Sequence, residues 1–424
     1  TAAAYAAPAP TAPPRQRIAS LDIVRGVVVV LMAIDHVRVY SGQPAGGPTY
    51  GIFFTRWITH FVAPAFVFLA GTAAFLYGQR VNDRGRLSRF LFTRGLWLVL
   101  LELTVLRLAW TFNFDFANYL LAGVIWMIGW CMVLMSAIVF LPRTAIAVGS
   151  IAVIVGHNAT DAIPGFREAI TSGPLGWLGK IAYAGGAIPN GEQGPLLILF
   201  VLVPWIAVMA AGYAFGPVML GSPEKRRATC LKLGAWMIAA FVVLRALDVY
   251  GDPRHWRPRP PAAQPAASAQ AQAATPAAAP RPTPRPQPPA LISFLGTTKY
   301  PASLLFLLMT LGPMFVLLGL VEGASGAIAG ALETFGRVPF FYYLLHIPTI
   351  HVAAIIVSVI REGHVDPWLF QNHPMGNGPS PKGYIWSLPL LYLVWAIVIG
   401  VLYVACRWYA RVKAEKRSAL LSYL

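Results

Sequence analysis

The sequence predicts an all-α membrane protein, a bundle of about ten transmembrane helices with both termini in the cytoplasm. Three observations lead to this class. The chain of 424 residues is 57% hydrophobic and only 12% charged, whereas a soluble domain is about 25% charged. Apolar windows of about 20 residues, long enough to cross the hydrocarbon core, recur along it. Between these windows, arginine and lysine gather in alternate loops, as the positive-inside rule requires of cytoplasmic loops.

The expected spans follow from these windows in order. They cover approximately 20–40, 56–78, 88–110, 119–141, 144–159, 196–219, 229–249, 302–322, 337–360 and 385–408. The fifth is the shortest. Pro204 in the sixth span is expected to kink its helix, because proline lacks the backbone N–H, and Pro348 lies inside the ninth span.

The loops that would face the cytoplasm carry clusters of cations. They contain Arg15, Arg17, Arg80, Arg84, Arg86, Arg89, Arg143, Lys225, Arg226, Arg227, Arg407, Arg411, Lys413, Lys416 and Arg417. We therefore interpret the net charge of +17 as a topology signal and expect no nucleic acid partner. The segment 254–289 also carries arginines but is placed outside, because long loops cross a membrane largely regardless of charge.

Composition divides the chain into four parts. Residues 1–17 lack the pattern of a signal peptide and are expected to be a disordered tail. Residues 18–253 hold the first seven spans. Residues 254–289 are rich in proline and alanine and are expected to form a disordered outer linker. Residues 290–424 hold the last three spans and a basic cytoplasmic tail. The outer loops 160–195 and 361–384 are rich in glycine and proline and are expected to cover an outer vestibule.

The first span, 20–40, holds an unusual number of ionisable side chains. These are Asp22, Arg25, Asp35, His36 and Arg38. Charged groups inside hydrocarbon are costly, so a span that carries several of them usually faces a protein interior or a wet cavity. Arg25 and His36 differ by about 20° around the helix axis and lie about 16 Å apart along it. This helix is therefore expected to place polar groups at two depths of one buried face.

The histidines indicate proton-transfer chemistry near the outer face. Of the eight, all but His346 fall in outer loops or in the outer halves of spans, and histidine readily exchanges a proton near neutral pH. His36 and His60 are the best catalytic candidates, because they lie near the outer ends of consecutive antiparallel spans. Asp35 either orients His36 or forms an i,i+3 ion pair with Arg38. The sequence leaves both pairings open, and a histidine can also be a packing or interfacial residue.

Other ionisable residues fall at the same two depths. Glu102 in the third span is a second candidate to orient a histidine. Arg25 and Arg94 lie at the inner depth and are candidates to hold the phosphates of a cytosolic cofactor, because guanidinium matches phosphate geometry. Lys299 and Arg245 lie at the outer mouth, where they would bind an anionic substrate or polarise a carbonyl oxygen. The alternatives are an Arg25–Asp22 pair and side chains that snorkel to the interface.

Several kinds of chemistry lack sequence support. No HxxxH or HExxH spacing occurs on any expected helix, so we expect no metal. There is no GxGxxG, P-loop, GxSxG elbow or CxxC pair, the usual motifs of redox, nucleotide-hydrolysing and serine-esterase enzymes. The three cysteines fall in apolar segments and suggest no disulfide.

Four segments carry a family resemblance. They are RIASLDIVRGVVVVLMAIDH at 17–36, FVAPAFVFLAG at 61–71, LLAGVIWMIGWCMVLMS at 120–136 and PWIAVMAAGYAFG at 204–216. In these segments the chain resembles the heparan-alpha-glucosaminide N-acetyltransferase family of transmembrane acyltransferases, and it looks most like the bacterial relatives of that family. The resemblance runs from about Arg17 to the C-terminus.

This resemblance implies an enzyme that takes an acetyl group from cytosolic acetyl-CoA and delivers it to a sugar amine or hydroxyl across the membrane. In the animal enzyme the active histidine resembles a position in the first outer loop, but residues 41–55 here contain no histidine. No residue is therefore carried over as the catalyst, and His36 and His60 at the edges of this loop are inferred substitutes. Arg25 and Arg94 would bind CoA, and His346, Lys299 and Arg245 would contact the acceptor.

The resulting prediction is a multi-pass acyltransferase of the bacterial inner membrane that modifies a glycan. Its expected partners are acyl-CoA, a sugar acceptor and membrane lipids, and the sequence leaves a homodimer open. The alternative is a proton-coupled transporter or flippase in which the same ionisable residues line a permeation path. A third possibility is a membrane scaffold whose buried charges are only paired.

Overall fold

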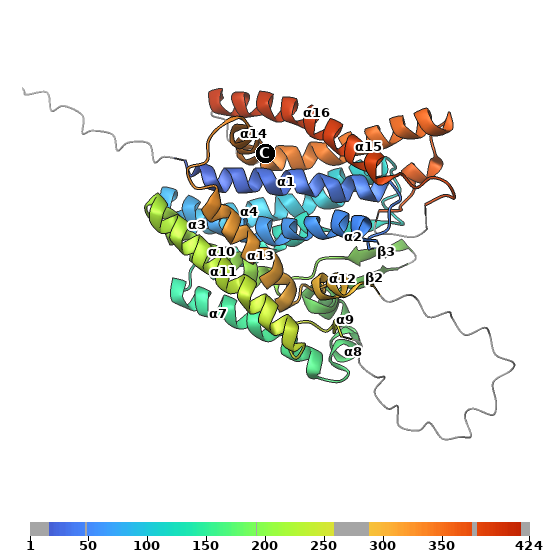
Figure 1. Cartoon of the computed structure of the whole chain (residues 1–424). Helices are drawn as coiled ribbons and strands as arrows, with labels where there is room; N and C mark the ends of the chain where they lie inside the picture. The colour runs from blue at the N-terminus through green and yellow to red at the C-terminus, as the bar shows by residue number, and fades with distance from the viewer. Residues whose placement is uncertain (1–16, 47–48, 192, 258–287, 375–379, 417–424) are drawn as a thin grey trace, which may run out of the picture.

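The computed structural model describes residues 17–46, 49–191, 193–257, 288–374 and 380–416. It is 73% helical, and its long helices lie together as a bundle (Figure 1). The helices are α1 Ala19–Tyr40, α2 Tyr50–Trp57, α3 Val62–Val81, α4 Arg84–Leu101, α5 Arg107–Thr111, α6 Val124–Ile138, α7 Arg143–Gly156, α8 Phe166–Thr171, α9 Gly176–Gly179, α10 Trp205–Phe215, α11 Pro223–Leu247, α12 Ala290–Leu295, α13 Leu304–Leu320, α14 Ala327–Arg337, α15 Pro339–Glu362 and α16 Leu388–Glu415. The strands are β1 Leu120–Ala122, β2 Gly186–Asn190 and β3 Gln193–Ile198.

The described helices agree with a membrane protein. Among them, five are long and apolar enough to cross a bilayer. These are Tyr50–Val81, Arg143–Ala162, Pro223–Leu247, Pro339–Glu362 and Leu388–Glu415. Shorter apolar helices occupy Val124–Ile138, Trp205–Leu220 and Leu304–Leu320. The count of ten spans stays a prediction, and so does the orientation of the termini.

Helix α1 lies at the centre of the bundle. It contacts α3, α13, α14, α15 and α16, and α14 to α16 lie on one side of it with α3 and α13 on the other (Figure 1). Its packing against α14 is backbone to backbone. A Cβ on Gly26 would lie 2.0 Å from the carbonyl oxygen of Leu332, and one on Gly336 would lie 1.7 Å from that of Asp22. The absence of a side chain at both positions therefore lets the two helices touch.

The expectation of an all-α fold is wrong in one region. A three-stranded sheet has the order β1-β3-β2, with β1 parallel and β2 antiparallel to β3. The expected fourth and sixth spans therefore each begin as a strand. Pro204 lies at the N-cap of α10 and not inside a helix, because proline cannot donate a helical hydrogen bond and the helix starts after it. Short apolar runs do not distinguish strand from helix by periodicity, which explains the error.

Other features of the expected spans are present. The third span runs through α4 and α5, joined by a π-helical turn at Glu102–Leu106. The ninth is α15, which continues through Pro348. The expected outer loop 160–195 contains α8, α9 and β2. The expected tail at 1–17, apart from Arg17, the outer linker between 258 and 287, and the end of the basic tail at 417–424 lie outside the described residues.

Candidate active site

The Arg25 end of α1 borders two adjoining cavities of about 700 and 470 Å³. Both are lined by Arg25, Arg80 and Lys413, and the smaller one is also lined by Arg94. We call the two together the basic cavity. Arg25 forms an ion pair with Asp22 at 3.3 Å, so the i,i+3 pair that the sequence allowed is present. The structure brings the two predicted cofactor-binding arginines, Arg25 and Arg94, to one cavity wall.

A smaller cavity of about 80 Å³ lies beside the His36 end of α1. Asp35, His36, Glu102 and Lys299 line it, and we call it the histidine cavity. Among the described residues, four line both this cavity and the basic cavity. These are Met32, Val62, Val124 and Tyr343. The two cavities thus lie on either side of one layer of side chains, which we call the shared wall.

The His36 ring faces a second histidine from a distant part of the chain. His36 Nδ1 lies 2.7 Å from His346 Nε2, and His346 Nδ1 lies 2.6 Å from the Tyr343 carbonyl oxygen. A carbonyl only accepts, so in a neutral ring His346 Nδ1 carries the proton and its Nε2 accepts. His36 Nδ1 is then the donor, and His36 Nε2 keeps its lone pair. That nitrogen has no hydrogen-bond partner within the described residues, so it is available as a base.

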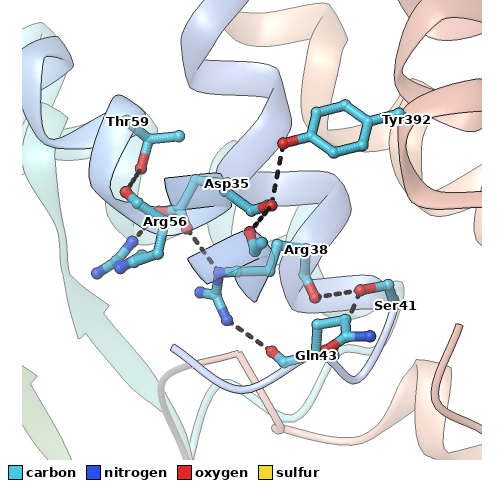
Figure 2. A network of polar contacts seen from close by, with 9 residues as sticks. Asp35, Arg38, Ser41, Gln43, Arg56, Thr59 and Tyr392 are labelled. Carbon is cyan, nitrogen blue, oxygen red and sulfur yellow. Dashed lines mark hydrogen bonds and ion pairs between the residues drawn. The ribbon is translucent and has the colours of Figure 1, made fainter. Parts of the chain in front are cut away.

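Asp35 is held by two arginines. Arg38 Nε donates to it at 2.8 Å, and Arg56 pairs with its other oxygen. Figure 2 shows both guanidinium groups around this carboxylate. Of the two pairings that the sequence left open, the structure contains the one with Arg38. His36 is oriented by His346 instead, although Asp35 lies next to it in sequence and lines the same cavity.

Glu102 also lines the histidine cavity, at the start of the π-helical turn. Its carboxylate accepts the Ile125 N–H at 3.1 Å, in the first turn of α6. Gly123 leaves room for it, since a Cβ there would lie 2.5 Å from a Glu102 oxygen. The carboxylate is therefore fixed at a helix N-terminus, where a negative charge is stabilised. No hydrogen bond joins it to a histidine within the described residues.

His60 lies apart from this pair. It belongs to the 3₁₀ turn Ile58–Phe61 and lines a separate cavity of about 510 Å³ with Arg56 and Trp57. Its Nδ1 is buried and has no hydrogen-bond partner in the part of the chain that the structure describes. The structure does not bring His60 to the histidine cavity, and its catalytic role stays a prediction.

The comparisons with known proteins bear on what this site does. The family model described as "Heparan-alpha-glucosaminide N-acetyltransferase, catalytic" matches residues 17–250, more than half of the chain. The chain belongs to this family. A comparison with curated proteins found no match. The acetyltransferase family establishes a membrane protein with transferase chemistry, as the sequence resemblance implied. The matched segment contains Arg25, His36 and Glu102, whereas Tyr343 and His346 lie beyond it.

Two predicted substrate contacts of this acetyltransferase-family chain have different surroundings. Lys299 lines the histidine cavity, and burial lowers the pKa of its ammonium group. Arg245 is fully buried and lines none of the cavities described above. It donates to backbone carbonyl oxygens. These belong to Ser293, Phe294, Gly296 and Arg254. These bonds hold the end of α12 in position. They do not support the prediction that Arg245 contacts a substrate.

Sequence reasoning missed several residues of the two cavities. Arg80 and Lys413 were assigned only to loops, and Tyr343 was not singled out. The tyrosine could have been found, because it precedes His346 by three residues and shares its helix face. Among the described residues, no group of three histidine, cysteine, aspartate or glutamate side chains forms a metal site.

Proposed function

We propose that this protein transfers an acetyl group from acyl-CoA in the basic cavity to a sugar hydroxyl or amine in the histidine cavity. The observation that carries the proposal is the shared wall, which separates a cation-lined cavity from a cavity that holds an available imidazole nitrogen. A donor and an acceptor that enter from opposite sides would meet there. The family match supports the reaction type, and the two-sided geometry supports its direction.

The basic cavity fits the donor in charge and in size. Its wall carries several arginines and one lysine, and the phosphates of CoA need cationic hydrogen-bond donors. Arg25 and Arg94 would hold phosphates nearest to the shared wall, with Arg80 and Lys413 beside them. The thioester would then point toward Met32 and Tyr343 of the shared wall.

The same cavity supports the orientation that we propose. Its wall combines cations from four loops predicted to face the cytoplasm. These are Arg17, Arg80, Arg226 and Lys413. Their common location agrees with a cytosolic donor, both termini inside and a ten-span bundle. The histidine cavity would then face the outer side, which in a bacterial inner membrane is the periplasmic side with its envelope glycans.

The reaction needs a base for the acceptor, and His36 Nε2 supplies it. The acceptor oxygen or nitrogen attacks the thioester carbon, and its proton passes to His36 Nε2. The bond between carbon and sulfur breaks, and the CoA thiolate leaves with that proton. His346 keeps His36 in the required tautomer throughout. General-base assistance of this kind is typically worth about 10²- to 10⁴-fold in rate.

The test uses the purified full-length chain in detergent with acetyl-CoA and a panel of amino sugars. Acetyl-CoA should raise the melting temperature, and CoA release should increase with an accepted sugar. His36→Gln should lower kcat by about 10²- to 10⁴-fold. The matched control is His364→Gln at an exposed histidine, and it should leave kcat unchanged. If acetyl-CoA does not stabilise the wild type and the wild type releases no CoA, the proposal is rejected and a transporter is favoured.

A further inference from the structure

We propose that Tyr343 is a catalytic residue of the transfer, whose hydroxyl donates a hydrogen bond to the thioester carbonyl oxygen as negative charge develops on it. This inference rests on the proposed function. It starts from the shared wall, whose other members, Met32, Val62 and Val124, carry no side-chain hydrogen-bond donor. Tyr343 is therefore the polar group of that wall.

The tyrosine hydroxyl is free to act in this way. The Tyr343 side chain is 6% exposed and lines both cavities. No hydrogen bond joins its hydroxyl to another of the described residues. The hydroxyl can therefore donate to a bound carbonyl oxygen at the shared wall without breaking a bond within the protein.

The position of Tyr343 is tied to that of the base. Its own carbonyl oxygen accepts the His346 Nδ1 proton at 2.6 Å, and His346 in turn orients His36. One helical turn of α15 thus fixes the hydroxyl and, through His346, the base. Preorganised donors of this kind act without rearrangement during the reaction, which is why they lower barriers effectively.

Other donors in the histidine cavity are placed less well for this role. Lys299 and Trp110 line that cavity but not the basic cavity from which the thioester would arrive. The Thr59 hydroxyl already donates to the Arg56 carbonyl oxygen at 2.7 Å. In this set, Tyr343 is the residue that lines both cavities.

The step balances without a further reactant. The acceptor's electron pair forms the new bond to the carbonyl carbon, and the carbonyl π electrons move to oxygen, where the Tyr343 O–H donates without losing its proton. The electron pair then returns as the bond between carbon and sulfur breaks. The proton that His36 took from the acceptor leaves with the thiolate.

The test compares Tyr343→Phe with Tyr342→Phe, its neighbour on α15. The Tyr342 hydroxyl is buried without a partner among the described residues, and Tyr342 lines neither cavity, so this control removes the same chemical group elsewhere. Tyr343→Phe should lower kcat by about 10²- to 10³-fold with little change in the acetyl-CoA KM. Tyr342→Phe should keep kcat.

A spectroscopic measurement separates this role from a structural one. Acetyl-CoA labelled with ¹³C at the thioester carbonyl is bound to each variant, and its carbonyl stretch is read by difference infrared spectroscopy. The band should move to higher frequency in Tyr343→Phe and stay in place in Tyr342→Phe and Lys299→Met. An unchanged band or an unchanged kcat in Tyr343→Phe overturns the inference, and a shift in Lys299→Met alone assigns the donor to Lys299.

The same experiment separates this inference from the proposed function. If the wild type binds and transfers acetyl groups but Tyr343→Phe does so equally well, only the role of Tyr343 fails. If the wild type neither binds acetyl-CoA nor releases CoA, the proposed function itself fails.

Discussion

Replacing His346 tests the tautomer argument most directly, because this residue acts on the reaction only through His36. His346→Leu removes the acceptor 2.7 Å from His36 Nδ1 and leaves a part-buried donor unpaired, which costs about 1–3 kcal/mol. The ring can recover this energy by moving its proton to Nε2, and it then no longer presents a lone pair to the acceptor. At 1.4 kcal/mol per tenfold change, kcat should fall by about 5- to 150-fold.

The assay is steady-state CoA release by purified variants, with two comparisons. His346→Gln retains an acceptor oxygen for His36 and should recover part of the lost rate. His351→Leu, five residues further along α15 and equally buried, should destabilise the protein without changing kcat, because its ring contacts Phe112 and not His36. Equal rates for His346→Leu and His346→Gln, or equal losses for His346→Leu and His351→Leu, would refute the reasoning.

Three further perturbations test other parts of the structure. Arg25→Ala and Arg94→Ala should each weaken acetyl-CoA binding by about 10- to 100-fold in titration calorimetry, because a charge-assisted hydrogen bond contributes about 1.5–3 kcal/mol. Arg89→Ala, at an exposed arginine that lines neither part of the basic cavity, should leave the binding unchanged. Gly26→Ala should lower the free energy of unfolding by about 1–3 kcal/mol or more, because the new methyl group would clash with Leu332. Gly330→Ala, at a position that faces open space, should leave it unchanged. Thermal melting of the two variants measures the difference. Burial lowers the pKa of His373 to about 4, so between pH 6.5 and 4 the unfolded chain binds a proton that the folded chain does not. This group should therefore contribute a loss of stability of up to about 3 kcal/mol as the pH drops through this window. His373→Phe should make the fall of the melting temperature with pH shallower in melts at a series of pH values.

The sequence was sufficient to identify the first span as the centre of the protein and to place its polar groups at two depths. Charge density, helical spacing and apolar length are local properties of the sequence. They predicted the first and last residues of α1, α7 and α13 to within a few positions. The local ion pairs, Arg25 with Asp22 and Arg38 with Asp35, are i,i+3 neighbours and were among the predicted alternatives.

The sequence was not sufficient to determine which helices meet. His36 and His346 are separated by 310 positions, and no periodicity within either helix indicates that α1 and α15 contact each other. The sequence placed both His36 and His60 at the outer ends of consecutive spans and favoured His36, but it did not show that the two histidines line different cavities. The sheet was missed because β1 and the second half of β3, residues 196–198, are as apolar as the membrane spans that follow them.

The apolar part of the shared wall bears on a conflict that every acyl-CoA enzyme must resolve. A thioester beside an available imidazole nitrogen reacts with water as readily as with a sugar unless water is excluded. Here the imidazole faces a cavity of only about 80 Å³, while the larger volume lies on the cation-lined side. Met32, Val62 and Val124 offer water no hydrogen bonds at the point where the two cavities meet. Under the proposed function, an acceptor group that fills the small cavity would displace water from His36, and we expect transfer to outcompete hydrolysis for that reason.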